Sequence, residues 1–247
     1  MKTKTKVKKE SKFAFLKWFD PFTYVDLLLE KTIGKQEGFW NNVIYWACYI
    51  VTAFISALLL YKIIGLFLGV AEPLAIVVSS SMVPNLHIGD VVIFTKPTNL
   101  KVAEVEIDRS IRYKDVSEFA EINYHINQHG LEEVKSITIN DKTFIVEDAI
   151  TNKNSVVVYK SNVNGKDIIH RAILKIKARD GIFIITKGDN HKTNLYIDQD
   201  CDIIREDNQV IAQKPCLNLY PIRIEDISRK KIGKIPYIGY IKLVLFQ

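Results

Sequence analysis

The sequence of 247 residues contains little cysteine, glycine and proline, and each shortage excludes a class of protein. Three cysteines without a Cys-x-x-Cys motif exclude a disulfide-dense scaffold and most zinc modules. Eleven glycines and seven prolines, beside 48% hydrophobic residues, exclude a largely disordered chain. Of the cysteines, only Cys201 and Cys216 are candidates to pair, and the sequence favours two free thiols over a disulfide between them.

Arginine is missing from the most basic segment of the chain. The net charge is +6, and residues 1–12 contribute +5 of it through six lysines and one glutamate, with no aromatic residue among them. Nucleic-acid recognition needs a basic face or stripe on the folded protein. This lysine tail therefore argues against nucleic-acid binding. The length suits one or two domains of about 100–200 residues.

Charge is also missing from the nineteen residues between Val43 and Tyr61, and the apolar character continues past Lys62. About 20 apolar residues are needed to cross the hydrocarbon core of a bilayer. We therefore expect a transmembrane helix over residues 41–71. A cleaved secretory signal fits poorly, because the apolar run begins too far from the N-terminus and is too long.

The distribution of lysine predicts the orientation of this span. Residues 1–40 carry nine lysines, whereas residues 71–95 carry none. The positive-inside rule then places the N-terminus in the cytoplasm and residues 72–247 outside, in a single-pass protein of the cell membrane. The cytoplasmic part includes a short amphipathic helix, with Asp20-Pro21 at its start and Gly34 at its end, which lies on the membrane or packs on a partner.

Beyond the span the hydrophobic pattern changes to short runs separated by turn signals, which is typical of β-strands. The runs are residues 74–78, 91–95, 135–140, 144–147, 155–160, 168–177 and 182–187. We therefore expect residues 72–247 to form a mostly β domain.

One helix is expected to interrupt these strands. Asp115 with Glu118 matches a capping box, the apolar residues that follow recur near the helical period, and Gly130 would end the helix. His125 and His129 would then lie one turn apart. Because they have no third ligand nearby, they indicate a solvated face, and the sequence predicts no metal site.

Three serines, Ser79, Ser80 and Ser81, directly follow the apolar run 74–78 and precede Met82-Val83-Pro84. Serine-rich stretches are ordinary turn material. The same arrangement can also present a hydroxyl nucleophile, which needs a base to take its proton and donors for the oxyanion.

His170 is the candidate base, because it is the histidine that lies inside an apolar strand pattern. Asp180-Gly181 is a typical two-residue hairpin turn, and that turn places His170 opposite position 191. Asp189 is then a diagonal neighbour of His170 on the same face. A bulge near the site would change this register.

These segments resemble the motifs of type I signal peptidases. Residues 79–84 (SSSMVP), followed by Gly89-Asp90-Val91-Val92, resemble the nucleophile box, in which the serine just before the methionine attacks. Ile169-His170-Arg171 is similar to the second box of the archaeal and endoplasmic-reticulum branch. That branch has histidine where the usual bacterial enzymes have a lysine base.

Two later segments extend the resemblance. Residues 186–190 (TKGDN), then Asp198-Gln199, resemble the third box, and residues 235–240 (IPYIGY) resemble the closing segment of the family. The four matches keep the family's order. Each match alone is weak, but their combination is specific.

The chain departs from the family in two places. Ser81 and His170 are 89 positions apart, further than in compact members, which predicts an inserted α/β subdomain over about 98–165. Asp198 follows Asp189 by nine positions, more than in similar relatives, so two aspartates compete to orient the histidine. The register favours Asp189, whereas the Asp-Gln pair resembles the archaeal pattern and favours Asp198 more strongly.

The resemblance implies a signal-peptidase-like β domain and a serine endopeptidase that removes signal peptides from translocated preproteins without a cofactor. Ser81 would attack, His170 would act as base, and Asp198 or Asp189 would orient the imidazole. The Ser79 hydroxyl and the Ser81 backbone N–H would stabilise the oxyanion, with Met82 in a supporting role. The implied partners are secretory preproteins, the lipid bilayer and the protein translocation machinery.

Three other functions fit parts of the same sequence. One is a membrane-anchored β domain that binds secreted proteins without cleaving them. Another is a serine–lysine peptidase of related fold that uses Lys166 or Lys175. The third is the same serine–histidine chemistry dedicated to one pilin-like or coat protein.

Overall fold

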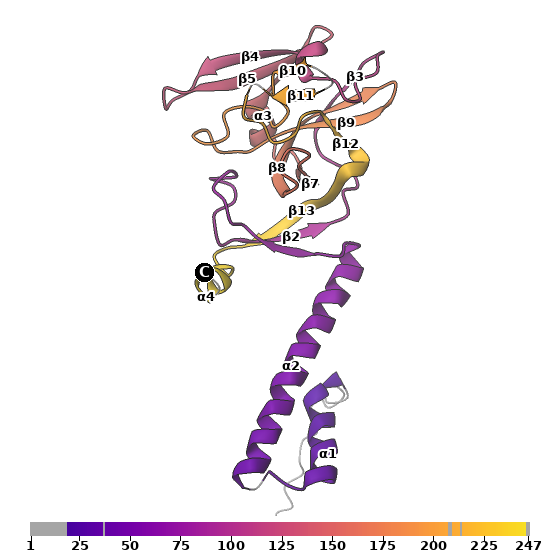
Figure 1. Ribbon diagram of the computed structural model, residues 1–247, viewed down its shortest axis with the longest axis vertical. Coiled ribbons are helices and arrows are strands. Elements are labelled where there is room, and N and C mark those ends of the chain that lie inside the picture. Colours follow the sequence, from indigo (N-terminus) through magenta and orange to yellow (C-terminus); the bar gives the residue numbers. More distant parts are fainter. Residues whose placement is uncertain (1–18, 37, 207–208, 213, 246–247) are drawn as a thin grey trace, which may run out of the picture. The chain divides into compact units, whose positions relative to one another are not determined.

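The computed structural model describes residues 19–36, 38–206, 209–212 and 214–245 (Figure 1). It divides the chain into two compact units, Met1–Phe67 and Leu68–Gln247, which are described separately. The lysine tail, residues 1–12, lies outside the described residues.

The first unit contains helix α1 (Pro21–Ile33) and most of helix α2 (Phe39–Leu68). The predicted caps of α1 are confirmed: the Asp20 carboxylate accepts the Phe22 N–H at 3.0 Å, and Gly34 ends the helix with φ 84°. Helix α2 has 30 residues, and its mean hydropathy reaches 2.2, so it is long and apolar enough to cross a membrane. An apolar helix near the N-terminus is therefore confirmed.

The second unit is built on an eight-stranded sheet with the order β1-β2-β13-β7-β8-β9-β12, in which β3 also pairs with β8 (Figure 1). The strands are β1 (Leu74–Ile76), β2 (Val91–Thr95), β3 (Ala103–Glu106), β7 (Val156–Lys160), β8 (Asp167–Ala178), β9 (Gly181–Lys187), β12 (Ile222–Arg223) and β13 (Ile227–Ile235). All pairs are antiparallel except β3 with β8. The mostly β domain predicted from the sequence is confirmed.

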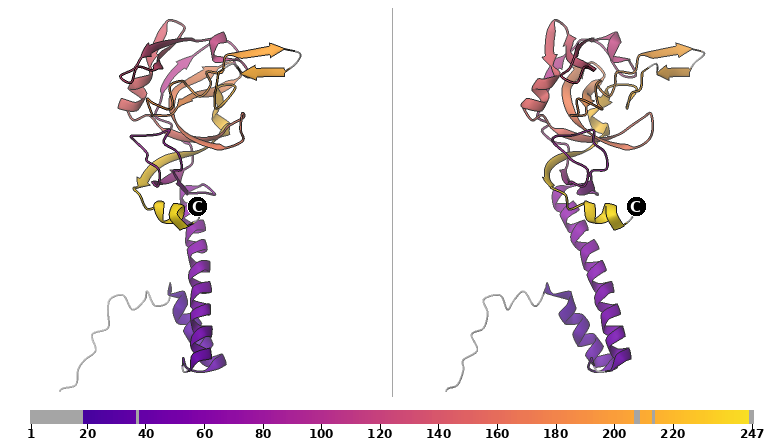
Figure 2. Two further views of the ribbon diagram at one scale, coloured as in Figure 1. Left: turned by 60° about the vertical axis from the view of Figure 1, so that its left-hand side comes forward. Right: turned by 90° about the vertical axis from the view of Figure 1, so that its left-hand side faces the viewer.

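Smaller elements complete the second unit. A three-stranded sheet contains β4 (Glu121–Ile126), β5 (Glu132–Ile139) and β6 (Lys142–Ile145), and α3 (Val146–Thr151) follows it. The remaining elements are the single turn η2 (Val116–Glu118), the strands β10 (Ile203–Glu206) and β11 (Gln209–Ala212), the turn η3 (Ile224–Asp226) and α4 (Tyr240–Leu245). In both views of Figure 2 the orange β10–β11 hairpin extends away from the rest of this unit.

The helix expected after Asp115 is wrong. The capping box of Asp115 and Glu118 is present, but it caps only the turn η2, and residues 121–126 then form strand β4 against β5. Pairing with β5 supplies hydrogen bonds to this segment, and Ile122 and Tyr124 pack against the core. Such tertiary packing outweighs a weak helical period.

The predicted relation between His125 and His129 is wrong for the same reason. His125 lies on β4, and His129 lies in the turn after it, so the two are not one helical turn apart. Both side chains are exposed.

The predicted register of the β8–β9 hairpin is also wrong. Ala178 pairs with Gly181, so the turn residues are Arg179 and Asp180. The Asp180 carboxylate accepts the backbone N–H groups of residues 111–112 at 3.1 and 2.9 Å, which holds Asp180 in the turn.

A bulge then shifts the register again between Ala172 and Leu174. The ladder ends where Arg171 pairs with Lys187, so His170 lies beyond its last pair. Bulges commonly re-aim side chains beside functional sites. Together the two shifts remove the expected pairing of His170 with position 191.

Candidate active site

The serines of the first motif lie in a short loop, residues 79–86, which we call the nucleophile loop after the role predicted for Ser81. Its turn is closed by backbone hydrogen bonds from Val83 N to the Ser80 carbonyl at 3.1 Å and from Leu86 N to the Met82 carbonyl at 2.8 Å. Ser81 is half-buried, and its Oγ lies 3.2 Å from the Ser79 Oγ.

The side chain of Met82 anchors this loop in the hydrophobic core. It is 2% exposed and belongs to a core cluster with Val77, Leu86, Val92, Phe94, Val156 and Val158. A buried thioether fills such irregular gaps well. The position next to Ser81 is therefore fixed by packing, while the serine itself remains accessible.

His170 projects from β8 and is 2% exposed. Its Nδ1 lies 2.8 Å from both carboxylate oxygens of Asp198. If Nδ1–H donates to this carboxylate, the proton stays on Nδ1 and leaves Nε2 as an acceptor. This is the tautomer that a general base needs.

Asp198 is itself held by further donors. Its Oδ2 accepts the Tyr159 hydroxyl at 2.9 Å and the Thr186 hydroxyl at 2.6 Å. Burial alone would raise the pKa of the Asp198 carboxyl, but His170 and these hydrogen bonds outweigh it and lower the pKa. Burial, together with the Asp198 charge, raises the pKa of the Tyr159 hydroxyl, so this group remains a donor.

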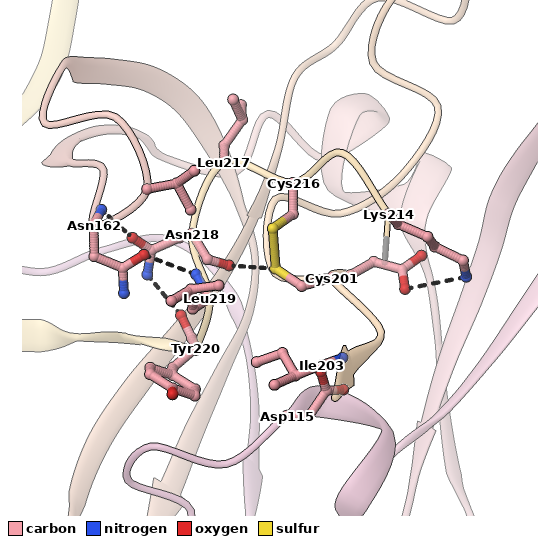
Figure 3. Close-up of a disulfide and its surroundings, with 12 residues drawn as sticks. Asp115, Asn162, Cys201, Ile203, Lys214, Cys216, Leu217, Asn218, Leu219 and Tyr220 are labelled. Atoms are coloured by element: carbon pink, nitrogen blue, oxygen red, sulfur yellow. Dashed lines mark hydrogen bonds and ion pairs between the residues drawn. A yellow bond between two sulfur atoms is a disulfide. The ribbon is translucent and has the colours of Figure 1, made fainter. Parts of the chain in front are cut away.

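A disulfide joins Cys201, just after Asp198, to Cys216 (Figure 3). The expectation of two free thiols is wrong. The chain folds back so that the N–H groups of Leu217 and Asn218 donate to the Asp198 carbonyl at 3.0 and 2.9 Å. This return brings the two cysteine Cα atoms to 5.1 Å, within the range that a disulfide bridges.

Asp189 has a different partner. Its carboxylate binds Arg171 through two hydrogen bonds, from Nε at 2.7 Å and from Nη2 at 2.6 Å. Its Oδ2 also accepts the Asn85 side-chain amide of the nucleophile loop at 2.8 Å. Both members of the ion pair are buried. The structure therefore brings Asp198 to His170 and Asp189 to Arg171.

The residues around Asp189 also hold the nucleophile loop. The Asn190 N–H donates to the Ser81 carbonyl at 3.0 Å, and its side-chain amide donates to the Ser80 carbonyl at 2.8 Å. A Cβ on Gly188 would lie 2.7 Å from the Ser81 carbonyl oxygen, so only glycine permits this approach. Residues 188–190 therefore clamp the backbone of Ser80 and Ser81.

Ser81 and His170 line one pocket of about 260 Å³. Its apolar wall comes from the core beneath the loop and from the edge strand β1, and includes Ala75, Val77, Phe94, Val158 and Ile169. Arg229 also lines the pocket and donates to Glu72 at 2.7 Å and to Asp167 at 2.6 Å. Neither Lys166 nor Lys175 is among the described residues that line it, and Lys175 instead pairs with Glu104.

The Gly-Asp pair of the first motif joins the closing segment. The Gly239 N–H donates to the Gly89 carbonyl at 2.8 Å. Asp90 is fully buried and accepts the Lys234 ammonium at 2.7 Å. Burial raises the pKa of the Asp90 carboxyl, but Lys234 and the N–H groups of His87 and Tyr237 outweigh it, and the pKa is lowered. Asp90 thus joins the end of the first motif to strand β13 through Lys234.

The sequence reasoning missed two groups of polar residues at the site. Tyr159 and Thr186 bind Asp198, and Asn85 and Asn190 join Asp189 and the nucleophile loop. A signal existed for Tyr159, since a tyrosine inside an apolar strand must find a partner for its hydroxyl. The partner itself lies 39 positions away, which no local pattern reveals.

No family model matches the chain. Among curated proteins it is similar to the signal peptidase complex catalytic subunit sec11 of Sclerotinia sclerotiorum, with 32% identity over 99 residues, which cover 39% of this chain and 47% of the relative. SEC11 of Metarhizium robertsii shares 32% identity over 94 residues (37% and 44%), and SEC11 of Pyricularia oryzae shares 30% over 99 residues (39% and 47%).

The chain thus matches about half the length of these curated relatives. The resemblance to the endoplasmic-reticulum branch of signal peptidases is confirmed by them. Each of these relatives is named as the catalytic subunit of a signal peptidase complex.

Proposed function

We propose that this protein is a membrane-bound serine endopeptidase that removes N-terminal signal peptides from translocated preproteins, and that its second unit is a signal-peptidase-like β domain. The observation that carries the proposal is the pairing of His170 with Asp198 in the pocket that Ser81 lines. This is the combination of nucleophile, base and orienting acid that acyl transfer requires. The similarity to signal peptidase catalytic subunits supports it.

In the proposed mechanism Ser81 Oγ attacks the scissile carbonyl while His170 Nε2 takes its proton. His170 then protonates the leaving amine, and a water repeats the sequence to release the acyl group. Asp198 holds the tautomer and stabilises the imidazolium that forms. The hydrogen bond between Ser81 Oγ and His170 Nε2 forms in this proposal when the substrate binds, since catalytic hydrogen bonds are often in place only in the complex.

The oxyanion is stabilised by the Ser81 backbone N–H and by the Ser79 hydroxyl, which already lies beside the nucleophile. One such donor typically lowers the activation barrier by about 3 kcal/mol. Met82 supports both groups by fixing the loop in the core.

The substrate is proposed to bind as an extended strand. Strand β1 stands at the end of the strand order, and its second edge has no strand partner among the described residues. Such an edge can pair with a peptide backbone. The small apolar pocket beside it suits small side chains, which mark the end of a signal peptide.

We propose the following membrane arrangement. Residues 1–40 are cytoplasmic, residues 41–71 span the cell membrane once, and residues 72–247 form the extracytoplasmic peptidase domain with an insertion over about 98–165. The lysine distribution supports this orientation. The Cys201–Cys216 disulfide supports it too, because disulfides persist in oxidising compartments. The proposed partners are secretory preproteins, the bilayer and the translocation machinery.

The proposal is tested with the full chain in proteoliposomes and a secretory preprotein, with the new N-terminus identified by mass spectrometry. Ser81→Ala and His170→Ala should abolish cleavage. The exposed residues Ser110 and His129 provide matched controls, and their alanine variants should cleave like the wild type.

Other outcomes would point to the alternative functions. Cleavage at the same bond by Ser81→Ala would refute the serine mechanism. Cleavage by His170→Ala together with its loss in Lys175→Ala would favour a lysine base. Cleavage of a pilin-like substrate but of no other preprotein in a panel would restrict the proposal to a dedicated peptidase.

A further inference from the structure

The segment 187–191 connects the nucleophile loop to the insertion. Its central residues, 188–190, clamp the backbone of Ser80 and Ser81. The two residues that bracket this clamp, Lys187 and His191, both bind the carboxylate of Glu133. One side chain from the insertion thus holds both ends of the segment that holds the nucleophile.

Lys187 is the more buried of the two anchors. Its side chain is 1% exposed, and its ammonium donates to Glu133 Oε1 at 2.9 Å and to the Gly188 carbonyl at 3.1 Å. A buried ammonium is stable only when it is paired, because burial removes its hydration. The bond to Gly188 ties the same ammonium to the first residue of the clamp.

His191 is the second anchor. Its Nδ1 lies 2.8 Å from Glu133 Oε1, and its Nε2 lies 3.7 Å from a carboxylate oxygen of Glu147. The Asn127 side-chain amide donates to Glu133 at 2.9 Å and to the His191 carbonyl at 2.7 Å. The insertion therefore binds both the side chain and the backbone of His191.

Glu133 is 3% exposed and lies on β5, and it lines a pocket of about 470 Å³ together with Lys187 and His191. Burial raises its pKa, but Lys187, Asn127 and His191 outweigh burial, and the pKa is lowered. Glu133 is therefore ionised at neutral pH. Glu133, Lys187 and His191 line this pocket, and the ion pairs of Glu133 with the other two hold all three side chains in place.

We propose that Glu133 is a positioning residue for Ser81, acting through Lys187 and His191 on the clamp at residues 188–190. The proposal rests on the peptidase function proposed above. It assigns a role to the insertion: the insertion holds the nucleophile loop in the geometry for attack. A displacement of about 1 Å at a reacting atom can lower a rate by about 100-fold.

The first test replaces Glu133 by glutamine in the full chain. Glu132→Gln is the matched control, because Glu132 is the neighbouring glutamate on β5 and is exposed. In steady-state cleavage of a preprotein by the protein in proteoliposomes, Glu133→Gln should lower kcat by about 10- to 100-fold. The KM should stay unchanged, since Glu133 does not line the pocket that Ser81 lines. The control should cleave like the wild type.

Hydrogen exchange measured by mass spectrometry gives a readout that does not depend on activity. Glu133→Gln should speed exchange in peptides covering residues 79–86 and 188–191, while strands β2, β7 and β13 keep their protection. A purely structural role would instead raise exchange in all strands together, or only in β4, β5 and β6. Either of those patterns, or a kcat within twofold of the wild type, would overturn the proposal.

A second variant covers the case in which Glu133→Gln does not fold, since it leaves the buried ammonium unpaired. His191→Gln removes one anchor at a side chain that is 30% exposed, and it should give a smaller change of the same kind. Unchanged exchange at residues 79–86 in a folded His191→Gln variant would overturn the proposal. If the wild type cleaves no preprotein, the proposed function fails, but the exchange result still decides whether Glu133 holds the loop.

Discussion

Replacing Asp198 by asparagine tests whether Asp198 or Asp189 orients the imidazole of His170. The carboxylate accepts three hydrogen bonds, from His170, Tyr159 and Thr186. Asparagine keeps the shape but offers one acceptor oxygen and one NH₂ donor. With its oxygen at the Oδ2 position, which accepts Tyr159 and Thr186, the amide directs its NH₂ group at His170 Nδ1, and this conflict of two donors is relieved when His170 carries its proton on Nε2. That tautomer cannot take the Ser81 proton.

The expected loss in kcat is on the order of 10⁴-fold, as for other triads with the wrong histidine tautomer. At 1.36 kcal/mol per factor of ten this corresponds to about 5.4 kcal/mol of transition-state stabilisation. A loss of this size requires that the acid acts on His170 directly. Loss of packing alone would lower the free energy of unfolding without lowering kcat to this extent.

The stability of the Asp198→Asn variant should also depend less on pH than the stability of the wild type. Because the folded state lowers the pKa of Asp198, the ionised carboxylate stabilises the fold above its unfolded pKa of about 3.9. That contribution disappears as the pH falls through the folded value. The wild type should therefore lose more stability than the variant between neutral pH and acid, measured by thermal denaturation across the range.

Asp189→Asn is the matched comparison, because Asp189 is equally buried but binds Arg171. It breaks a buried ion pair, which costs about 3–5 kcal/mol of stability. Its effect on kcat should stay near 100-fold or below, through the position of the nucleophile loop. The assignment is refuted if folded Asp198→Asn keeps a tenth of the wild-type kcat, or if Asp189→Asn loses as much as Asp198→Asn.

Three further perturbations test the supports of the site. Reduction of the Cys201–Cys216 disulfide should lower the free energy of unfolding by about 3 kcal/mol for a loop of this length, measured by denaturant titration with and without reductant. Gly188→Ala should lower kcat by on the order of 100-fold, because its Cβ would displace the Ser81 carbonyl, and steady-state cleavage measures this. Asp90→Asn should flatten the loss of stability in thermal melts as the pH falls below about 3.9, since the lowered pKa of Asp90 makes its contribution vanish in acid.

Local patterns in the sequence predicted the elements whose environment is set by near neighbours. The apolar helix α2, the caps of α1 and the strands β2, β7, β8 and β9 follow from composition and alternation over a few residues. The chemistry-bearing segments around Ser81 and His170 were also visible. The reason is physical, since caps, hydrophobic periods and turn residues act over one or two turns of chain.

Local patterns failed where two conformations had similar local preference. The segment 119–126 carries a helical period, yet it pairs as β4 because β5 and the core offer it more contacts. The turn signal Asp180-Gly181 was real, but the turn residues are Arg179 and Asp180, and the Asp180 carboxylate binds a distant backbone segment. A single-residue change of register alters every pair that follows.

By itself the sequence determined that a mostly β domain follows an apolar helix, and which serine, histidine and aspartates are candidates. Only the tertiary structure decided that Asp198 binds His170, that Asp189 binds Arg171, and that Cys201 pairs with Cys216. These contacts join residues 15 to 28 positions apart. They depend on a bulge in β8 and on the return of the chain after Asp198, which are set by packing of the whole domain.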